Sequence, residues 1–237
     1  VPTLIVSGSV ARADQIDGTL RVSAERGEGR IGKTALETDL GADFRLLDLD
    51  LEHGRARLAG RVWLEDARVR SGDEAVDAWW ARLDVDSLAL SARENLDVSA
   101  LFRAKVRDAL PGIALLSARG DLPGWLGSAL PLRELDVTGT VNRRCKLTDI
   151  QFTRVSGGPL VSRGRLQSVP DAVRGAFLVR LSDFEPISAG LSFGKDDTTL
   201  SLFASDGWFD ERQADLDALA ASVVDAPCVP APRTCGG

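Results

Sequence analysis

Apolar residues recur at every second position over long stretches of this chain, and this alternation constrains the fold more than any other feature. The clearest run extends from Leu47 to Leu64, where Leu47, Leu49 and Leu51 alternate with acidic residues. A period of two is typical of a β-strand with one apolar side and one solvent-facing side. Similar runs recur along most of the chain. We therefore expect roughly ten to thirteen strands, joined mainly as an antiparallel meander.

The run from Leu47 to Leu64 predicts a hairpin with a two-residue turn at His53-Gly54. The predicted opposite pairs are Leu51–Ala56, Leu49–Leu58, Leu47–Gly60, Glu52–Arg55 and Asp50–Arg57. A one-residue slip would break the charge pairs and expose the leucines, so the pattern and the turn select one register. A phase shift between Val85 and Leu88 indicates a bulge near Asp86-Ser87.

Two segments depart from the alternation and predict helices. Apolar residues between Asp97 and Leu110 fall near helical spacing, with Asp97 as a candidate cap and Pro111 as the stop. Nearer the end of the chain, Asp210 and Gln213 form a capping-box pattern ahead of an amphipathic stripe. We expect one central helix and one C-terminal helix.

These elements predict a mainly β fold with a single domain over residues 1–225. Its parts are a first half 1–96, a helical insert 97–131 and a second half 132–225, followed by a Pro- and Cys-containing tail at 226–237. Two arrangements would bury the apolar faces of these strands. The faces close on each other as a β-sandwich, which the strand pattern alone favours, or they line a long curved antiparallel sheet shaped like a half-pipe, in which acyl chains complete the burial.

Composition narrows the classes of function. A net charge of −6 argues against a surface that binds the phosphates of nucleic acid. One histidine, no tyrosine and three cysteines leave few groups for acid–base, nucleophilic or metal chemistry. We expect neither an enzyme nor a bound metal or cofactor.

Acidic residues on two predicted strands are the main candidates for a catalytic or calcium site. Asp48, Asp50 and Glu52 share one strand face, and Asp84 and Asp86 share another. Neighbouring strands would bring their carboxylates together. The simpler interpretation is an outer face in contact with solvent and arginines, so a hydrolase with paired carboxylates is the least favoured class.

The remaining motifs have simple interpretations. Cys228 and Cys235 either form a short disulfide loop in an oxidising compartment or are two thiols in a frayed end. We expect Cys145 to be a small buried residue at the start of a strand, and His53 to be a turn residue. The Gly-x-Gly-x-x-Gly pattern at 27–32 is expected to be a loop, because no helix follows it.

Several short segments of the second half carry a resemblance to a known family. They are LPGWL at 122–126, LDVTGTV at 135–141, the strand at 147–152, SGGPL at 156–160, GRL at 164–166 and WF at 208–209. Over residues 80–210 this order of features resembles the C-terminal region of the AsmA-like family of Gram-negative envelope proteins, which includes AsmA, TamB and YdbH. The chain is shorter than the bridging members of that family and shows no inner-membrane helix. The sequence leaves open whether an inner-membrane anchor lies in a segment before Val1.

The resemblance implies a taco-shaped sheet in the periplasm that binds phospholipid acyl chains, with a role in lipid transport or outer-membrane homeostasis. The expected partners are phospholipid or a membrane surface, and also other envelope proteins or further copies of the chain. The chain is also similar to the N protein of type II secretion, which implies the alternative of an assembly module without a ligand. The lipid-binding candidates are the most regular apolar face: Leu47, Leu49, Leu51, Leu58, Val62, Leu64, Leu83 and Val85.

Overall fold

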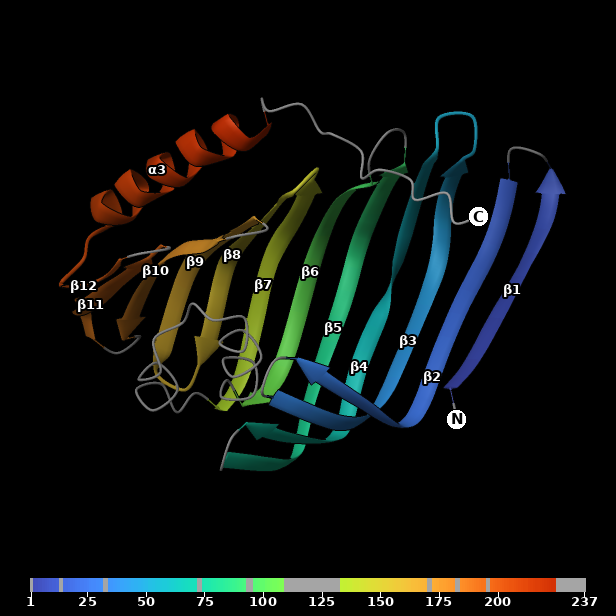
Figure 1. The fold of residues 1–237 in the computed structure, drawn as a ribbon, viewed down its shortest axis with the longest axis horizontal. Helices are drawn as coiled ribbons and strands as arrows, with labels where there is room; N and C mark the ends of the chain where they lie inside the picture. The colour runs from blue at the N-terminus through green and yellow to red at the C-terminus, as the bar shows by residue number, and fades with distance from the viewer. Residues whose placement is uncertain are drawn as a thin grey trace, which may run out of the picture.

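The protein is described by a computed structural model, which covers residues 2–12, 15–31, 34–71, 74–92, 96–108, 133–169, 172–181, 184–194 and 197–224. Within these residues, twelve strands form one antiparallel sheet in which each strand pairs with the next along the chain (Figure 1). The predicted meander is confirmed, and so is the open, curved sheet that we expected. The described residues form one sheet and not the two packed sheets of a closed sandwich.

The strands are long in the first half of the sheet and shorter in the second. Their bounds are β1 Pro2–Arg12, β2 Gln15–Ile31, β3 Thr34–Asp50, β4 Arg55–Ser71, β5 Glu74–Ala92, β6 Leu96–Asp108, β7 Arg133–Arg144, β8 Leu147–Gly157, β9 Leu160–Val169, β10 Ala172–Leu181, β11 Phe184–Phe193 and β12 Thr198–Leu202. The helix α3 spans Asp206–Val224 and follows the last strand.

A line of bulges bends the long strands β2 to β5 near one end. The register shifts at Ala24/Gly27, Glu37/Asp39 and Leu64/Ala67, and Arg26, Asp66 and Ala78 have positive φ angles. Bulges of this kind bend a strand and increase its twist. Figure 1 shows the ends of these strands turning away from the main run of the sheet.

The bent ends pack on the main part of the sheet. Trp79 is 4% exposed and forms a cluster with Ala67 and Val69, against which Leu64 and Val106 also pack. The indole Nε1 of Trp79 donates a hydrogen bond of 3.0 Å to the carbonyl oxygen of Asp108. The bend therefore has an apolar interior and a satisfied buried donor.

The helix α3 packs on one face of the sheet, over β8, β10 and β11. Phe209 and Leu216 form a buried cluster with Ala176 and Leu178 of β10. The predicted helix start at Asp210 is wrong, because the helix begins one turn earlier. Ser205 precedes it, and its side-chain oxygen accepts a hydrogen bond from the Trp208 N–H at 3.2 Å, as an N-cap does.

The predicted central helix is wrong over its first part, because residues 96–108 form the strand β6. This segment has apolar residues at both spacings. Val98, Phe102 and Val106 fit a helix, and with Ala100 and Ala104 they also alternate with period two. Pairing with β5 and β7 on both sides satisfies the strand pattern. Residues 109–132, which contain the rest of the predicted insert, lie outside the described residues.

The β3–β4 hairpin has a four-residue turn at Leu51–Gly54 instead of the predicted two-residue turn. Asp50 therefore pairs with Arg55, and Leu49 pairs with Ala56. The carboxylate of Asp50 accepts hydrogen bonds from the backbone N–H of His53 at 3.0 Å and contacts its ring Nδ1 at 2.8 Å. A side-chain-to-backbone hydrogen bond three residues along the chain thus closes the turn, in place of the backbone pairing of a two-residue turn. His53 is a turn residue, as predicted.

Three further predictions are resolved by the strand pattern. The bulge near Asp86-Ser87 is confirmed by a register shift between Val85 and Ser87. A turn lies at residues 158–159, within the glycine-rich signal at 156–159. The signal at 194–197 falls between β11 and β12, and its residues 195 and 196 lie outside the described residues. The glycine motif at 27–32 is not a loop as far as it is described, because Gly27 and Gly29 belong to β2.

Cys145 is not a buried strand residue. It is half-buried in the turn between β7 and β8, has a φ of 55° and is disulfide-bonded. The two alternatives for Cys228 and Cys235, a disulfide loop or two thiols, concern residues outside the described part of the chain. No helix in the described part of the chain is both long and apolar enough to span a membrane.

Candidate functional site

The register of the meander places apolar side chains in three rows that cross the sheet on one side. In an antiparallel pair, directly opposite residues project from the same face. A side chain on one strand can therefore be followed through its opposite partners from strand to strand. We name each row after its residue on β4 and call the three together the apolar face.

The Val62 row runs from β2 to β12. Its members are Val22, Ala42, Val62, Leu83, Ala104, Val137, Val155, Ser162, Val179, Ala189 and Leu202. Ser162 is the one residue of this row with a polar side chain.

The Gly60 row also runs from β2 to β12, and the Leu58 row runs from β3 to β12. The members of the Gly60 row are Leu20, Phe44, Gly60, Val85, Phe102, Gly139, Phe152, Gly164, Phe177, Leu191 and Leu200. The members of the Leu58 row are Leu46, Leu58, Leu88, Ala100, Val141, Ile150, Leu166, Gly175, Phe193 and Thr198. No charged side chain interrupts any of the three rows.

Phenylalanines and glycines alternate in the second half of the apolar face. Phe102, Phe152, Phe177 and Phe193 form a series in which successive ring centroids are 6.4, 5.7 and 6.3 Å apart. Each ring needs room over the opposite strand, and glycine provides it. A Cβ at Gly164 would overlap the ring of Phe177, for example. The Gly60 row remains apolar although Gly60, Gly139 and Gly164 carry no side chain.

Side chains of the apolar face shield one another without being sealed by a second sheet. Val85 is 8% exposed and Leu191 is 9% exposed, whereas most other members are half-buried. The bent ends of β2 to β5 cover one margin of the apolar face, where they pack against Leu64 and Val106. The helix α3 does not cover this face, because it contacts Ala176 and Leu178, which project from the opposite side.

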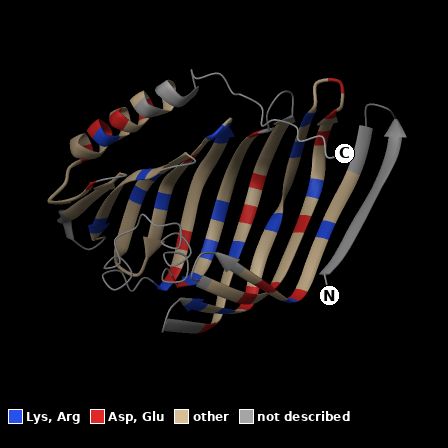
Figure 2. Ribbon diagram, in the orientation of Figure 1, with Lys and Arg blue, Asp and Glu red and all other residues tan. Residues whose placement is uncertain are grey.

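The opposite side of the sheet, the charged face, has ion pairs between neighbouring strands. Arg21, Asp43, Arg61, Asp84 and Arg103 follow one another across β2 to β6 in the register. The Arg21–Asp43 distance is 2.7 Å and the Arg61–Asp84 distance is 2.5 Å. Figure 2 shows the resulting bands of basic and acidic positions. These side chains are exposed, and each pair contributes only about 0.2–1 kcal/mol. The sheet is therefore amphipathic, with water on one side.

The structure brings together six of the eight lipid-binding candidates. Leu49, Leu58, Val62, Leu64, Leu83 and Val85 project from the apolar face. Leu47 does not, because it falls in the bulge between Leu46 and Asp48 and is 38% exposed. Leu51 lies in the hairpin turn and is 74% exposed. The error at Leu51 follows from the predicted two-residue turn, which extended the strand too far, and the error at Leu47 follows from the bulge.

Several members of the apolar face were missed by the sequence reasoning. Phe44 and Leu46 take the positions opposite Gly60 and Leu58 that had been assigned to Leu47 and Leu49. Ala100 and Phe102 were missed because their segment was interpreted as a helix. The period-two pattern of residues 98–106 was the signal that could have found them.

The candidate carboxylates do not form a common site. Strand β4 separates β3 from β5, and it carries Arg57 opposite Asp48 and Arg61 opposite Asp84. The hydrogen bond from the backbone N–H of His53 is the main cause that lowers the pKa of Asp50 from its ordinary value. Among the described residues, no group of three or more His, Cys, Asp and Glu side chains could hold a metal ion.

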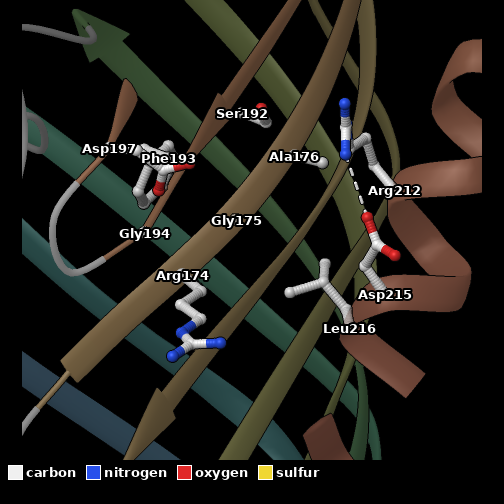
Figure 3. A pocket seen from close by; sticks show the side chains of 10 residues that line it. All are labelled: Arg174, Gly175, Ala176, Ser192, Phe193, Gly194, Asp197, Arg212, Asp215 and Leu216. Atoms are coloured by element: carbon white, nitrogen blue, oxygen red, sulfur yellow. Dashed lines mark hydrogen bonds and ion pairs between the residues drawn. The ribbon is translucent and has the colours of Figure 1, made fainter. Parts of the chain in front are cut away.

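A hollow between α3 and the ends of β10 and β11 is the clearest concavity near the helix (Figure 3). Its floor is Gly175 and Ala176, and Arg212 and Asp215 lie on the helix side. These two side chains already form an ion pair of 3.0 Å with each other. Arg174, Ser192 and Asp197 also line the hollow. The apolar face extends over many more strands than this hollow does, and it remains the candidate site.

An arginine of β9 fastens α3 to the charged face. The side chain of Arg165 is 6% exposed and bonds to Asp149 of β8 and Asp217 of α3, each at 2.6 Å. The hydrogen bonds that Arg165 donates to the carboxylate of Asp149 are the largest cause that raises the pKa of Arg165 above its ordinary value. The helix is thus held on the side of the sheet away from the apolar face.

Comparison with known proteins found no matching family model, no matching curated protein and no matching solved structure.

Proposed function

We propose that this chain is a periplasmic envelope protein that binds phospholipid acyl chains on the apolar face of its open sheet, in lipid transport or outer-membrane homeostasis. The observation that carries the proposal is the set of three rows, which cross nearly the whole sheet with no charged side chain. A monomeric soluble domain rarely leaves a continuous apolar surface of such extent without a partner. Acyl chains are partners that need no polar contact.

The dimensions of the apolar face suit an acyl chain. Ten strand spacings separate β2 from β12, and at about 4.8 Å each they amount to about 48 Å along the sheet. This length is about three times the ~15 Å of hydrocarbon in one leaflet of a bilayer. Each methylene group removed from water contributes about 0.8 kcal/mol, so two tails supply ample affinity.

Two further observations support an envelope location. Cys145 is disulfide-bonded, and disulfides persist mainly in oxidising compartments such as the periplasm. The segments from residue 80 to 210 resemble the AsmA-like family, whose members form periplasmic lipid-binding sheets. The partners that follow from the proposal are phospholipid or a membrane surface.

The test is to purify the protein from a bacterial periplasm, extract bound lipid and identify it by mass spectrometry. Leu83→Lys places an ammonium group in the Val62 row and is expected to reduce the amount of bound phospholipid several-fold. Leu101→Lys is the matched control, because Leu101 is 52% exposed and projects from the charged face. Absence of phospholipid from the unmodified protein, or equal loss in both variants, would contradict the proposal.

A structural or assembly module without a ligand is the second candidate. The observation that favours it is the exposed outer edge of β12, where Leu200 is 55% and Leu202 is 71% exposed. An assembly module would keep its contacts with other proteins in Leu83→Lys. It would carry no phospholipid in either form.

A further inference from the structure

We propose that two copies of this chain associate through β12, which pairs antiparallel with β12 of the second copy about a twofold axis at Leu200. This inference does not rest on lipid binding. It rests on the hydrogen-bonding register of the last strand, on the exposure of its side chains and on its lack of charge.

The register shows which backbone groups of β12 are used within the chain. The N–H of Phe203 donates to the carbonyl oxygen of Ser188 on β11 at 2.7 Å. In an antiparallel ladder, hydrogen-bonded and non-hydrogen-bonded pairs alternate. Phe203, Ser201 and Thr199 therefore bond to β11. The N–H and C=O groups of Thr198, Leu200 and Leu202 point to the outer edge, where no described strand pairs with them.

The side chains at this edge are apolar and exposed. Leu200 is 55% exposed, Leu202 is 71% exposed and Phe203 is 74% exposed. No charged residue or proline occurs between Thr198 and Phe203. Edge strands of monomeric proteins are usually protected from association by such residues. The outer edge of β12 has no such protection.

A second copy fits this edge better than other strands of the chain do. In a pair centred on Leu200, Thr198 lies opposite Leu202 of the second copy, and the outward N–H groups of both copies all find carbonyl acceptors. The five residues of β12 carry no charge, so the paired strands bring no like charges together. The edge strand β1 has 11 residues, whereas β12 has five, so pairing β1 with β12 would leave most of β1 unmatched.

The pair would extend the apolar face from one copy to the next. Leu200 belongs to the Gly60 row and would meet Leu200 of the second copy on the same side of the joined sheet. The Val62 row would continue through Leu202 to Thr198 of the second copy. The interface is of the isologous type that is commonest in homodimers.

The experiment measures association by sedimentation velocity over a range of protein concentration. The unmodified chain is expected to show a reversible monomer–dimer equilibrium. Leu200→Lys and Leu200→Glu each bring like charges together at the axis, and each is expected to raise the dissociation constant of the dimer by about tenfold or more. Ser201→Lys is the matched control, because Ser201 projects from the charged face and its backbone bonds to β11.

Mixing the two charge variants distinguishes this pairing from every other one. Lysine meets glutamate at the axis only when β12 pairs with β12, so an equimolar mixture is expected to regain the dimer. Hydrogen exchange of the unmodified chain provides a second measurement that needs no variant: the amides of Leu200 and Leu202 are expected to become protected as concentration rises. A chain that stays monomeric, head-to-tail oligomers, or folded variants whose mixture does not associate would overturn the proposal.

Discussion

The ring of Phe177 on β10 lies over Gly164 on β9, directly opposite it in the register. The three atoms nearest to a Cβ at position 164 all belong to this ring. A strand glycine usually weakens a sheet, but here it leaves space for an aromatic side chain of the opposite strand.

Gly164→Ala is therefore expected to destabilise the protein by about 1–3 kcal/mol, because the added methyl group forces the ring from its position. Urea unfolding followed by circular dichroism measures the change. Gly29→Ala on β2 is the matched control, since a Cβ there meets no atom within 4 Å. That substitution is expected to be neutral or to stabilise by up to about 1 kcal/mol. Equal effects of the two substitutions would show that the ring does not need the glycine.

We expect alanine substitutions of Asp149 and Asp217, the two carboxylate partners of Arg165, to destabilise the protein to different extents. Asp149 is 13% exposed and Asp217 is 68% exposed, and both bond to Arg165. Asp149→Ala leaves the buried guanidinium with one exposed carboxylate, Asp217, and with the neutral amide oxygen of Gln213 at 3.3 Å, which is expected to cost about 3 kcal/mol. Asp217→Ala is expected to cost about 1 kcal/mol or less. Denaturant unfolding measures both, and a larger effect at Asp217 would contradict this account.

Asp206 at the start of α3 predicts a dependence of stability on pH. The hydrogen bond from Arg180 is the main cause that lowers the pKa of Asp206 from its ordinary value, and Arg163 contributes as well. A carboxylate with a lowered pKa stabilises the fold above its ordinary pKa of about 3.9, and the contribution is lost as pH falls further. We expect Asp206→Asn to lower Tm at pH 7, with the difference shrinking toward zero near pH 3. A difference that grows in acid would contradict the assignment.

The disulfide of Cys145 predicts a cross-link that peptide mapping can find. Cys145 is one of three cysteines in the chain, and it is disulfide-bonded. Digestion without reductant is expected to give a cross-linked peptide that contains Cys145 and separates on reduction. Cys145→Ser is expected to lower the free energy of unfolding by about 2–4 kcal/mol. A peptide map in which Cys145 is a free thiol would contradict the prediction.

The strands, and the side of each strand that is apolar, could be predicted from the local sequence. Period-two alternation indicates the apolar side of a strand whatever its position in the sheet. Leu58, Val62 and Leu83 were placed on the apolar face for this reason, and the structure has them there. Between the turn and the bulge at Leu47, the hairpin prediction missed the register by two residues and still assigned Leu49 to the correct side. A shift of two preserves the face, whereas a shift of one would not.

Local pattern could not settle three other features, each for a physical reason. Residues 98–106 satisfy both a helical and a period-two spacing, and only pairing with β5 and β7 selects the strand. The four-residue turn depends on the contact of Asp50 with His53, and the disulfide of Cys145 depends on approach of a residue distant in sequence. Whether the apolar strand faces pack together or remain one open sheet is decided by the path of the whole chain, since both arrangements need the same alternation. The amino-acid sequence thus determined an amphipathic antiparallel meander, and tertiary structure alone decided that α3 packs on its charged side and leaves the apolar side accessible.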